Sequence, residues 1–179
     1  MDNKFILKEV IHTLFKPIFR RDPMPQQEPS YWLMKSEPDA YSIDTLKNDG
    51  VTLWDGIRNY QARNFMRKMN KGDKVFFYHS NCKPPGIVGL MEVIDLNIVD
   101  PTQFDKDSKY FDPKSKPDNP RWDCVKVKYQ LKSNKTLTLP ELKILFNEDE
   151  LLVVKKGNRL SIIPIELNVA HLILEKINA

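Results

Sequence analysis

Apolar residues along the chain gather in short stretches rich in β-branched and aromatic side chains, a pattern typical of strands. The stretch GIVGLMEVIDLNIV contains two glycines, which indicate a bend or bulge in a curved sheet. Uneven strands interrupted by a few short helices favour an α+β fold built on a mixed, mostly antiparallel barrel. The predicted strands are 31–36, 52–54, 73–80, 86–99, 122–131 and 159–165.

Helical signals lie between and after these strands. Ser42 can cap a helix that ends before Gly50, and Thr138 with Pro140 can open another. Pro164 is expected to introduce a closing helix, one face of which carries Ile165, Val169, Leu172, Ile173 and Lys176. The polar, proline-rich segment 100–121 is predicted to be a surface loop.

The run WDGIRNYQARNFMRKM at 54–69 predicts a two-sided helix from about Asn59. Its buried stripe is expected to contain Ala62, Phe65, Met66 and Met69. The opposite face carries Asn59, Arg63 and Arg67, which lie four residues apart with no acid between them. Because like charges at this spacing repel, we expect solvent or an anionic partner to compensate them.

The first thirty residues differ from the rest of the chain. A basic amphipathic stretch is followed by DPMPQQEPS, which reads as a linker, so residues 1–30 are predicted to be an extension and 31–179 the domain. We expect low order in the extension. A helix docked on the domain, a targeting sequence and a membrane-surface helix are the alternatives.

Composition narrows the possible functions. The net charge of +4 and a pI near 8.9 permit nucleic acid as a partner without requiring it. Cys82 and Cys124 lie far apart without metal-ligand spacing, and no metalloprotease, P-loop, dinucleotide or esterase motif occurs. We therefore expect no metal and no cofactor, and a reducing cytosol as the compartment, or nucleus or organelle in a eukaryote. No apolar run approaches the roughly 20 residues that span a bilayer.

Three polar stretches, KSEP, WDGIRNYQARN and YHSN, each follow a predicted strand and could converge on one pocket. Trp54 offers a flat surface for stacking a nucleobase, which Ser36, Asn59 or Asn64 could hydrogen-bond at its edge. Free N–H groups at the start of the Asn59 helix could add to phosphate binding. The predicted phosphate-binding residues are Arg58, Arg63 and Arg67, and the base pocket also includes Lys35, Glu37, Tyr78, His79, Ser80 and Ser161.

Structural interpretations of the same residues remain open. Trp32 and Trp122 are expected to pack as strand residues, whereas Trp54 could be either exposed to a cleft or buried. His79 could be a hydrogen-bonded structural histidine. Glu37 could simply pair with Lys35 or Arg58, and Arg63 and Arg67 could form a solvated helix face.

The strings YWLMKSEP, WDGIRNYQARN, YHSN, GIVG, YFDPKSK, PRW and RLSIIP occur in this order, and the chain from Tyr31 to about Lys176 thereby resembles an EVE domain. The resemblance implies a fold similar to the PUA superfamily, a pseudo-barrel flanked by short helices. It also implies nucleic-acid binding with a pocket for a modified base, and related domains flip such a base out of the helix. Ile57 and Ile163 depart from the family pattern.

The leading hypothesis is therefore a non-catalytic reader that takes a modified base, a modified cytosine in DNA, into a pocket beside Trp54. The resemblance also leaves two alternatives. One is a hydrolase acting on a modified nucleoside, in which Lys35, Glu37 and His79 would serve as nucleophile or base. The other is an RNA-binding module, which would prefer a 2′-hydroxyl. The sequence does not determine the oligomeric state.

Overall fold

The computed structural model describes residues 28–178. The predicted N-terminal extension, with its expected low order, lies almost wholly outside the described residues. The first described element, strand β1, begins at Tyr31, the residue at which the sequence predicts the first strand.

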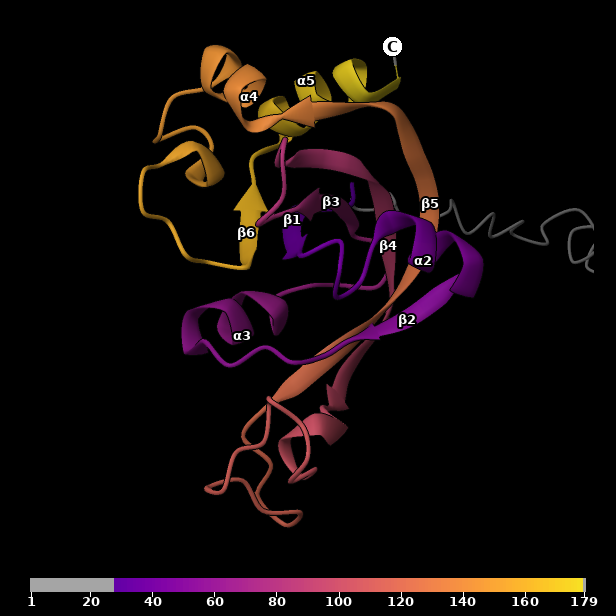
Figure 1. The fold of residues 1–179 in the computed structure, drawn as a ribbon, viewed down its shortest axis with the longest axis vertical. Coiled ribbons are helices and arrows are strands. Elements are labelled where there is room, and N and C mark those ends of the chain that lie inside the picture. Colours follow the sequence, from indigo (N-terminus) through magenta and orange to yellow (C-terminus); the bar gives the residue numbers. More distant parts are fainter. Residues whose placement is uncertain (1–27, 179) are drawn as a thin grey trace, which may run out of the picture.

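One six-stranded sheet forms the centre of the fold, in the order β2, β5, β4, β3, β1, β6 (Figure 1). Among the strands of residues 28–178, only β1 and β3 pair in parallel, so the predicted mixed, mostly antiparallel arrangement is confirmed. The sheet is open, with β2 and β6 at its edges, where the sequence predicts a barrel. The strands are β1 (Tyr31–Ser36), β2 (Val51–Trp54), β3 (Lys74–His79), β4 (Gly86–Val99), β5 (Asp123–Thr138) and β6 (Ile162–Ile165).

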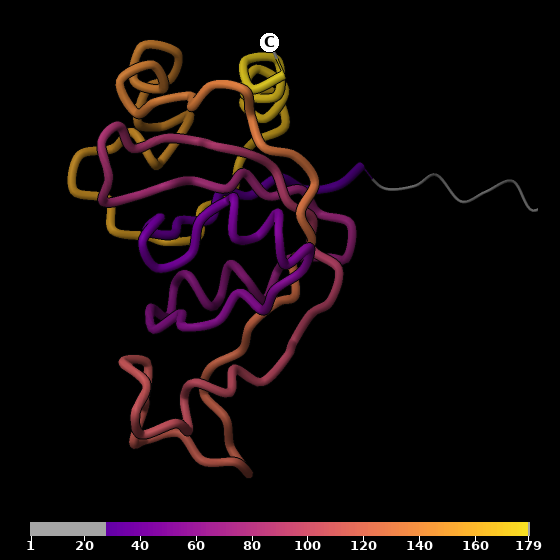
Figure 2. Tube along the Cα trace, turned by 45° about the vertical axis from the view of Figure 1, so that its right-hand side comes forward, coloured from indigo at the N-terminus to yellow at the C-terminus, as the bar shows by residue number. Residues whose placement is uncertain are grey.

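The two longest strands, β4 and β5, curve around the rest of the sheet (Figures 1 and 2). Their pairing register shifts at four places, and each irregularity adds local bend and twist. Gly89 lies at one of them, where an added Cβ would collide with the carbonyl oxygen of Leu131. The glycine that the sequence assigns to a bend thus permits close approach of two backbones.

Short helices begin at the predicted caps. Ser42 accepts a hydrogen bond from the N–H of Thr45 at the start of α2 (Ile43–Asp49), and Thr138 forms a capping box with Glu141 in α4 (Leu139–Leu145). Asn59 caps α3 (Tyr60–Met66), the helix predicted from this residue.

The predicted start of the closing helix is wrong. Pro164 lies inside β6, opposite Trp32, and α5 (Leu167–Asn178) begins three residues later. A proline fits here because β6 is an edge strand, which leaves one side of its backbone unpaired. Leu172 is exposed, and the buried face of α5 consists of Val169, Ala170, Ile173 and Ile177.

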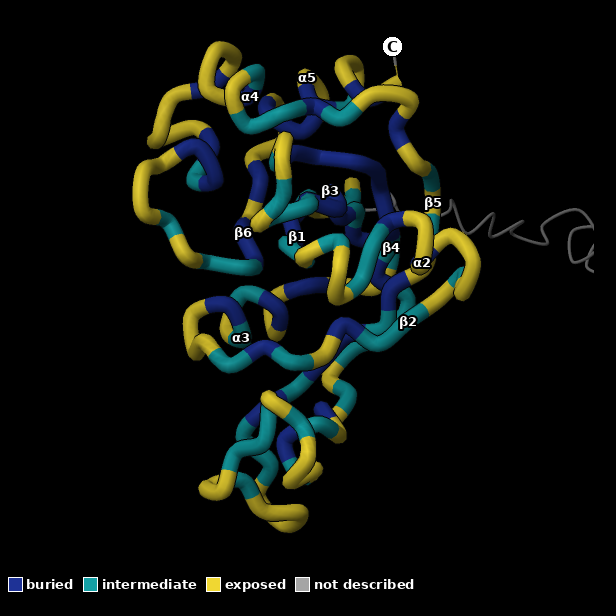
Figure 3. Tube along the Cα trace, viewed as in Figure 1, coloured by how far each residue is buried: buried dark blue, intermediate teal, exposed yellow. Residues whose placement is uncertain are grey.

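Apolar side chains cover both faces of the sheet, so β1 and β3 are buried on both sides (Figure 3). On one face Met34 and Phe77 join residues of α2 and α3. On the other, Leu33 and Phe76 join residues of α4 and α5. Alternate side chains of each strand thus enter different apolar clusters, as the pleat of a strand requires.

Residues 100–122 form an excursion between β4 and β5 that extends beyond one end of the sheet (Figure 2). It begins with a 3₁₀ helix at Pro101–Gln103. Buried Gln103 donates to the carbonyl oxygens of Asp100 and Trp122, at 2.7 and 2.8 Å, and accepts from the backbone N–H groups of Arg121 and Trp122. The predicted surface loop is therefore closed at its base by a buried polar side chain.

Candidate functional site

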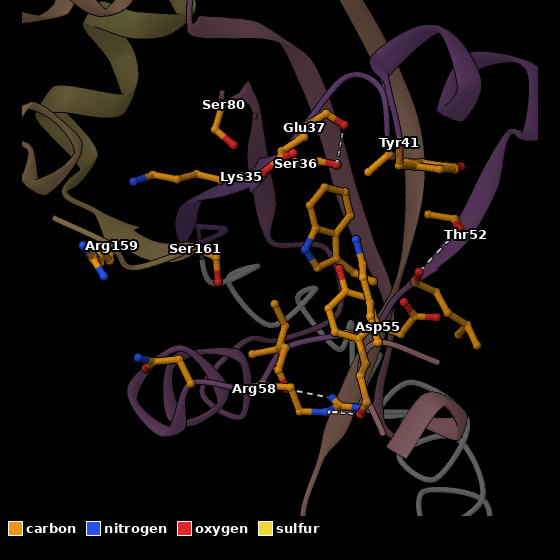
Figure 4. Close-up of a pocket in the computed structure, with 18 residues that line it drawn as sticks. Lys35, Ser36, Glu37, Tyr41, Thr52, Asp55, Arg58, Ser80, Arg159 and Ser161 are labelled. Atoms are coloured by element: carbon orange, nitrogen blue, oxygen red, sulfur yellow. Dashed lines mark hydrogen bonds between the residues drawn. The ribbon is translucent and has the colours of Figure 1, made fainter. Parts of the chain in front are cut away.

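A cleft of about 690 Å³ opens where β1, β2 and the chain leading into β6 meet the excursion (Figure 4). This volume lies within the roughly 300–1,000 Å³ typical of small-molecule sites. Residues from all three predicted polar stretches line it together, which confirms that these segments converge. The predicted residues that line it are Lys35, Ser36, Glu37, Trp54, Arg58, Asn59, Ser80 and Ser161.

Backbone hydrogen bonds hold the rim of the cleft in place. The N–H of Lys35 donates to the carbonyl oxygen of Ser161 at 2.9 Å, and the N–H of Ser80 donates to that of Ser36 at 2.9 Å. Because β1 and β3 run parallel, the loops after both strands emerge at this same edge. The topology therefore brings together residues more than forty positions apart in the chain.

The three tryptophans differ in what their indole N–H groups contact. Trp32 donates to Asp73 at 2.8 Å and Trp122 donates to Asp112 at 2.7 Å, so both are packing residues as predicted. Trp54 is 7% exposed and packs edge-on against Phe77. Its N–H has no hydrogen-bond partner within residues 28–178. No fully buried side-chain N or O atom in this part of the chain lacks a partner, so the N–H of Trp54 is not fully buried. The N–H of Trp54 is therefore reached from the cleft that the residue lines.

Ionisable groups of both signs line the same cleft. Burial lowers the pKa of Lys35, whose ammonium lies 5.9 Å from the ring centre of Tyr78. Burial also raises the pKa of Asp55, and the nearby Asp100 carboxylate adds to this rise. A carboxylate and an ammonium at one cleft can accept from and donate to a polar ring edge.

Arg58 lines the cleft, but three of its five donors are engaged by the excursion. Its guanidinium forms an ion pair with Asp100 at 2.7 Å and donates to the carbonyl oxygen of Tyr110 at 2.6 Å and to the hydroxyl of Thr102 at 2.9 Å. A fourth bond goes to the carbonyl of Ile57 at 2.9 Å. With four hydrogen bonds made, Arg58 fastens the excursion to the floor of the cleft.

Arg63, Arg67 and Asn64 of the predicted site lie outside the cleft lining. The expectation that only solvent or a ligand compensates the row is wrong for Arg67, which pairs with Asp123, a residue fifty-six positions away. The start of α3 also offers fewer donors than predicted, because the Asn59 side-chain oxygen accepts from the N–H groups of Gln61 and Ala62.

Tyr78 and His79 also lie outside the cleft. Tyr78 is 3% exposed and belongs to the apolar cluster under α4 and α5, and burial raises its pKa to about 12. Nε2 of His79 accepts from the backbone N–H of Ile43 at 3.1 Å, and burial lowers the pKa of this imidazole. His79 therefore makes the structural hydrogen bond that the sequence left open as an interpretation.

Several cleft residues escaped the sequence analysis. Tyr41 follows a turn, and Lys109 and Tyr110 belong to the excursion, where polar composition predicted only a surface loop. Arg159 comes from the segment before β6. No ion pair involves Lys35, Lys109 or Arg159 within residues 28–178. The string YFDPKSK was a usable signal for Tyr110, since it lies in the matched motif.

The described region contains neither a metal-binding cluster nor a membrane-spanning helix. No group of three or more His, Cys, Asp or Glu side chains in residues 28–178 is placed to hold a metal ion. In the same region, no helix has the length and apolar character needed to cross a bilayer.

The fold and cleft define a small α+β domain with a polar, aromatic-lined site at one edge of an open mixed sheet. The family model of the EVE domain matches residues 30–176, and the chain therefore belongs to the EVE domain family. Among curated relatives, thymocyte nuclear protein 1 of Homo sapiens is 48% identical over 125 residues, which cover 64% of this chain and 56% of the relative. The Danio rerio protein of the same name is 49% identical over 129 residues, covering 65% of this chain and 56% of the relative. The chain thus spans about half the length of the curated relatives it matches.

Solved structures share the fold over most of the described chain. The crystal structure of human THYN1 protein in complex with 5-methylcytosine-containing DNA has a TM-score of 0.78 and 39% identity, covering 84% of this chain and 98% of that one. A Pseudomonas syringae protein has a TM-score of 0.79 and 42% identity, covering 82% of this chain and 99% of that one. These matches confirm the predicted EVE, PUA-like fold class.

Proposed function

We propose that this chain is a non-catalytic nucleic-acid-binding domain that reads a modified cytosine in DNA by taking the extruded base into the cleft beside Trp54. Extrusion costs a few kcal/mol of unstacking, which stacking and hydrogen bonds inside the cleft must offset. Tyr41, Trp54 and Tyr110 supply aromatic surface around this volume. Aromatic stacking contributes about 1 to 3 kcal/mol per base, which is of the same order as that cost.

The observation that carries the proposal is the indole N–H of Trp54, which has no partner within residues 28–178, at a cleft that also contains Asp55. A cytosine ring has both acceptors and donors at its edge. The indole can donate to the ring carbonyl or ring nitrogen, while the Asp55 carboxylate can accept from the exocyclic amine. Ser36, Asn59, Ser80 and Ser161 offer further polar contacts.

The comparison with human THYN1 protein supports cytosine as the base and DNA as the polymer, because that protein was solved with 5-methylcytosine-containing DNA. Lys109 and Arg159 at the cleft, which form no ion pair within the described part of the chain, would hold phosphates together with the predicted Arg63 outside it. Arg58 is assigned to holding the excursion, since four of its five donors are already used. The name of the curated relatives favours a nuclear location over the cytoplasmic one expected from the sequence.

The direct test compares oligonucleotides that differ only at one cytosine: unmodified, 5-methylated or 5-hydroxymethylated. Fluorescence anisotropy should show tighter binding to a modified strand than to the plain one. The ionic strength is held fixed, because affinity for nucleic acid depends strongly on salt. Trp54→Phe keeps an aromatic ring and removes the N–H, so it should weaken binding of the modified strand. Equal affinity of the wild type for plain and modified strands would contradict the proposal.

Two further measurements distinguish the alternatives, one by the same binding assay and one by mass spectrometry. A matched RNA strand that binds more tightly than DNA would favour the RNA-binding module. Incubation with modified nucleosides followed by mass spectrometry tests the hydrolase, which requires a changed product mass. The structure offers that reaction little support, since His79 lies outside the cleft and its Nε2 already accepts from Ile43.

A further inference from the structure

A second aromatic and cationic cluster lies just beyond the cleft, on α3 and the end of the excursion. The rings of Tyr60 and Trp122 stack at 4.9 Å with an interplanar angle of 25°. The guanidinium carbon of Arg63 lies 4.7 Å from the Tyr60 ring centre, and that of Arg121 lies 5.7 Å from it. We call these four residues, Tyr60, Arg63, Arg121 and Trp122, the Tyr60 platform.

Tyr60 remains 46% exposed although it stacks on a buried tryptophan. Trp122 is 4% exposed and fixed by its hydrogen bond to Asp112. The exposed part of Tyr60 is therefore supported from behind by a rigid ring. An exposed aromatic ring on firm support, beside guanidinium groups, is the arrangement on which nucleic-acid bases and sugars pack.

One arginine of this region lacks a carboxylate partner within residues 28–178. Arg58 pairs with Asp100, Arg67 with Asp123 and Arg121 with Asp112. Arg63 has no carboxylate partner among residues 28–178 and uses its donors on the carbonyl oxygen of Arg121 and the amide oxygen of Asn64. Of these four arginines, Arg63 is the one whose charge no ion pair in the described chain neutralises. An anion on Arg63 would compensate it.

The platform is continuous with the cleft along the chain. Arg58 and Asn59 line the cleft, and Tyr60 follows them directly. Arg63 stands one helical turn further on, on the side of α3 that faces the excursion, because it donates to the backbone of Arg121 at 2.7 Å. A strand whose nucleotide enters the cleft would meet this surface next.

We propose that the Tyr60 platform is a second nucleic-acid contact, which holds the nucleotide adjacent to the one in the cleft, its nucleoside packing on Tyr60 and its phosphate on Arg63. This inference rests on the proposed function for the position of the first nucleotide. It assigns the two surfaces different tasks: the cleft distinguishes the modification, and the platform binds the strand whatever its sequence. The full recognition unit is thus longer than one nucleotide.

The test compares a ligand that reaches only the cleft with one that reaches both surfaces. The probes are 5-methyl-2′-deoxycytidine alone, a short single strand with that nucleoside at its centre, and the same strand with plain cytosine. Tyr60→Ala should weaken both strands about fivefold or more and leave the free nucleoside unchanged. Tyr60→Phe should retain strand binding, because it keeps the ring. Ile144→Ala removes an exposed side chain on α4, at the opposite end of the molecule, and should change nothing (Figure 1).

Arg63→Gln gives an independent readout. It should weaken both strands and reduce the slope of log affinity against log salt by about 1, the value for one lost phosphate contact. Lys143→Gln, which removes an exposed cation of α4, is the matched control. Thermal melting of each variant checks that it folds, and if Tyr60→Ala does not fold, the salt slope of Arg63→Gln decides.

The outcomes separate the two proposals. Platform variants that fold and bind both strands as the wild type does would overturn the platform, even if the modified strand is still preferred. A free nucleoside weakened as much as the strands would also overturn it, because the platform would then act only by shaping the cleft. Equal binding of plain and modified strands, with both weakened by Tyr60→Ala, would instead reject the proposed function and keep the platform.

Discussion

Arg58 and Asp100 form an ion pair in which Nη1 and Oδ2 are 2.7 Å apart, and the Asp100 side chain is inaccessible to solvent. The same Oδ2 accepts the N–H of Gly56 at 2.9 Å, while Oδ1 accepts from the N–H and hydroxyl of Thr102. A single buried carboxylate therefore joins the floor of the cleft to the start of the excursion.

Replacing this carboxylate should strongly destabilise the domain. Asp100→Asn leaves the Arg58 guanidinium without its anion, and breaking a buried pair typically costs about 3 to 5 kcal/mol. Urea unfolding measures the loss. Asp123→Asn removes the partner of Arg67 in a pair whose arginine is 42% exposed, so the free energy of unfolding should change by less than about 1 kcal/mol. Equal losses in the two variants would show that Asp100 has no special role.

Because Gly56 has no side chain, the ring of Tyr110 in the cleft wall can lie close to the backbone at this position. Its φ is +73°, and an added Cβ would lie 2.6 Å from the ring of Tyr110. Gly56→Ala should therefore displace Tyr110, in addition to the roughly 1 to 2 kcal/mol that left-handed backbone costs other residues. Gly72→Ala is the matched control, since Gly72 has a φ of +94° but open space around it.

Urea unfolding and DNA binding together distinguish these two effects. Both variants should lose stability, and only Gly56→Ala should also bind modified DNA less tightly. A Gly56→Ala protein with normal affinity would indicate that the position of Tyr110 does not matter for binding.

His79 should make stability depend on pH. Burial lowers the pKa of this imidazole below its usual 6.5, an effect that Lys132 increases and Asp44 opposes. Protonation would also remove the acceptor that Ile43 uses. Because the folded state disfavours the charged form, the stabilising contribution is complete above pH 6.5 and is lost as the pH falls through the lowered pKa.

Urea unfolding across about pH 5 to 8 checks this expectation. The wild type should lose stability toward the acid end more steeply than His79→Gln. His171→Gln removes an exposed imidazole on α5 and leaves His79 in place, so the slope due to His79 should remain. The same slope in the wild type and in His79→Gln would contradict the assignment.

Local signals in the sequence were sufficient for most of the elements. The strand at 86–99, the caps at Ser42 and Thr138 and the helix start near Asn59 lie where they were predicted, because alternation and capping depend on residues a few positions apart. Pro164 misled the prediction because its effect depends on whether β6 is an edge strand, which the sequence does not show.

Long-range pairing limited the prediction of the site. The partners of Arg58 and Arg67 lie forty-two and fifty-six residues away, so both arginines looked uncompensated in the sequence. The parallel pairing of β1 and β3 placed KSEP beside Ser80 as expected. Because side chains alternate along a strand, Tyr78 of β3 lies on the face of the sheet that packs against α4 and α5. The prediction grouped the polar side chains of this stretch without taking the alternation into account.

The most direct test of the account is the behaviour of three indole N–H signals in a ¹H–¹⁵N correlation spectrum during titration with DNA. Trp32 donates to Asp73 and serves as the internal reference, Trp122 belongs to the Tyr60 platform, and Trp54 lines the cleft. The account predicts that 5-methylcytosine DNA shifts the Trp54 signal far more than the Trp32 reference, and more than plain DNA does. A Trp54 signal that stays in place while the modified DNA is bound would contradict it.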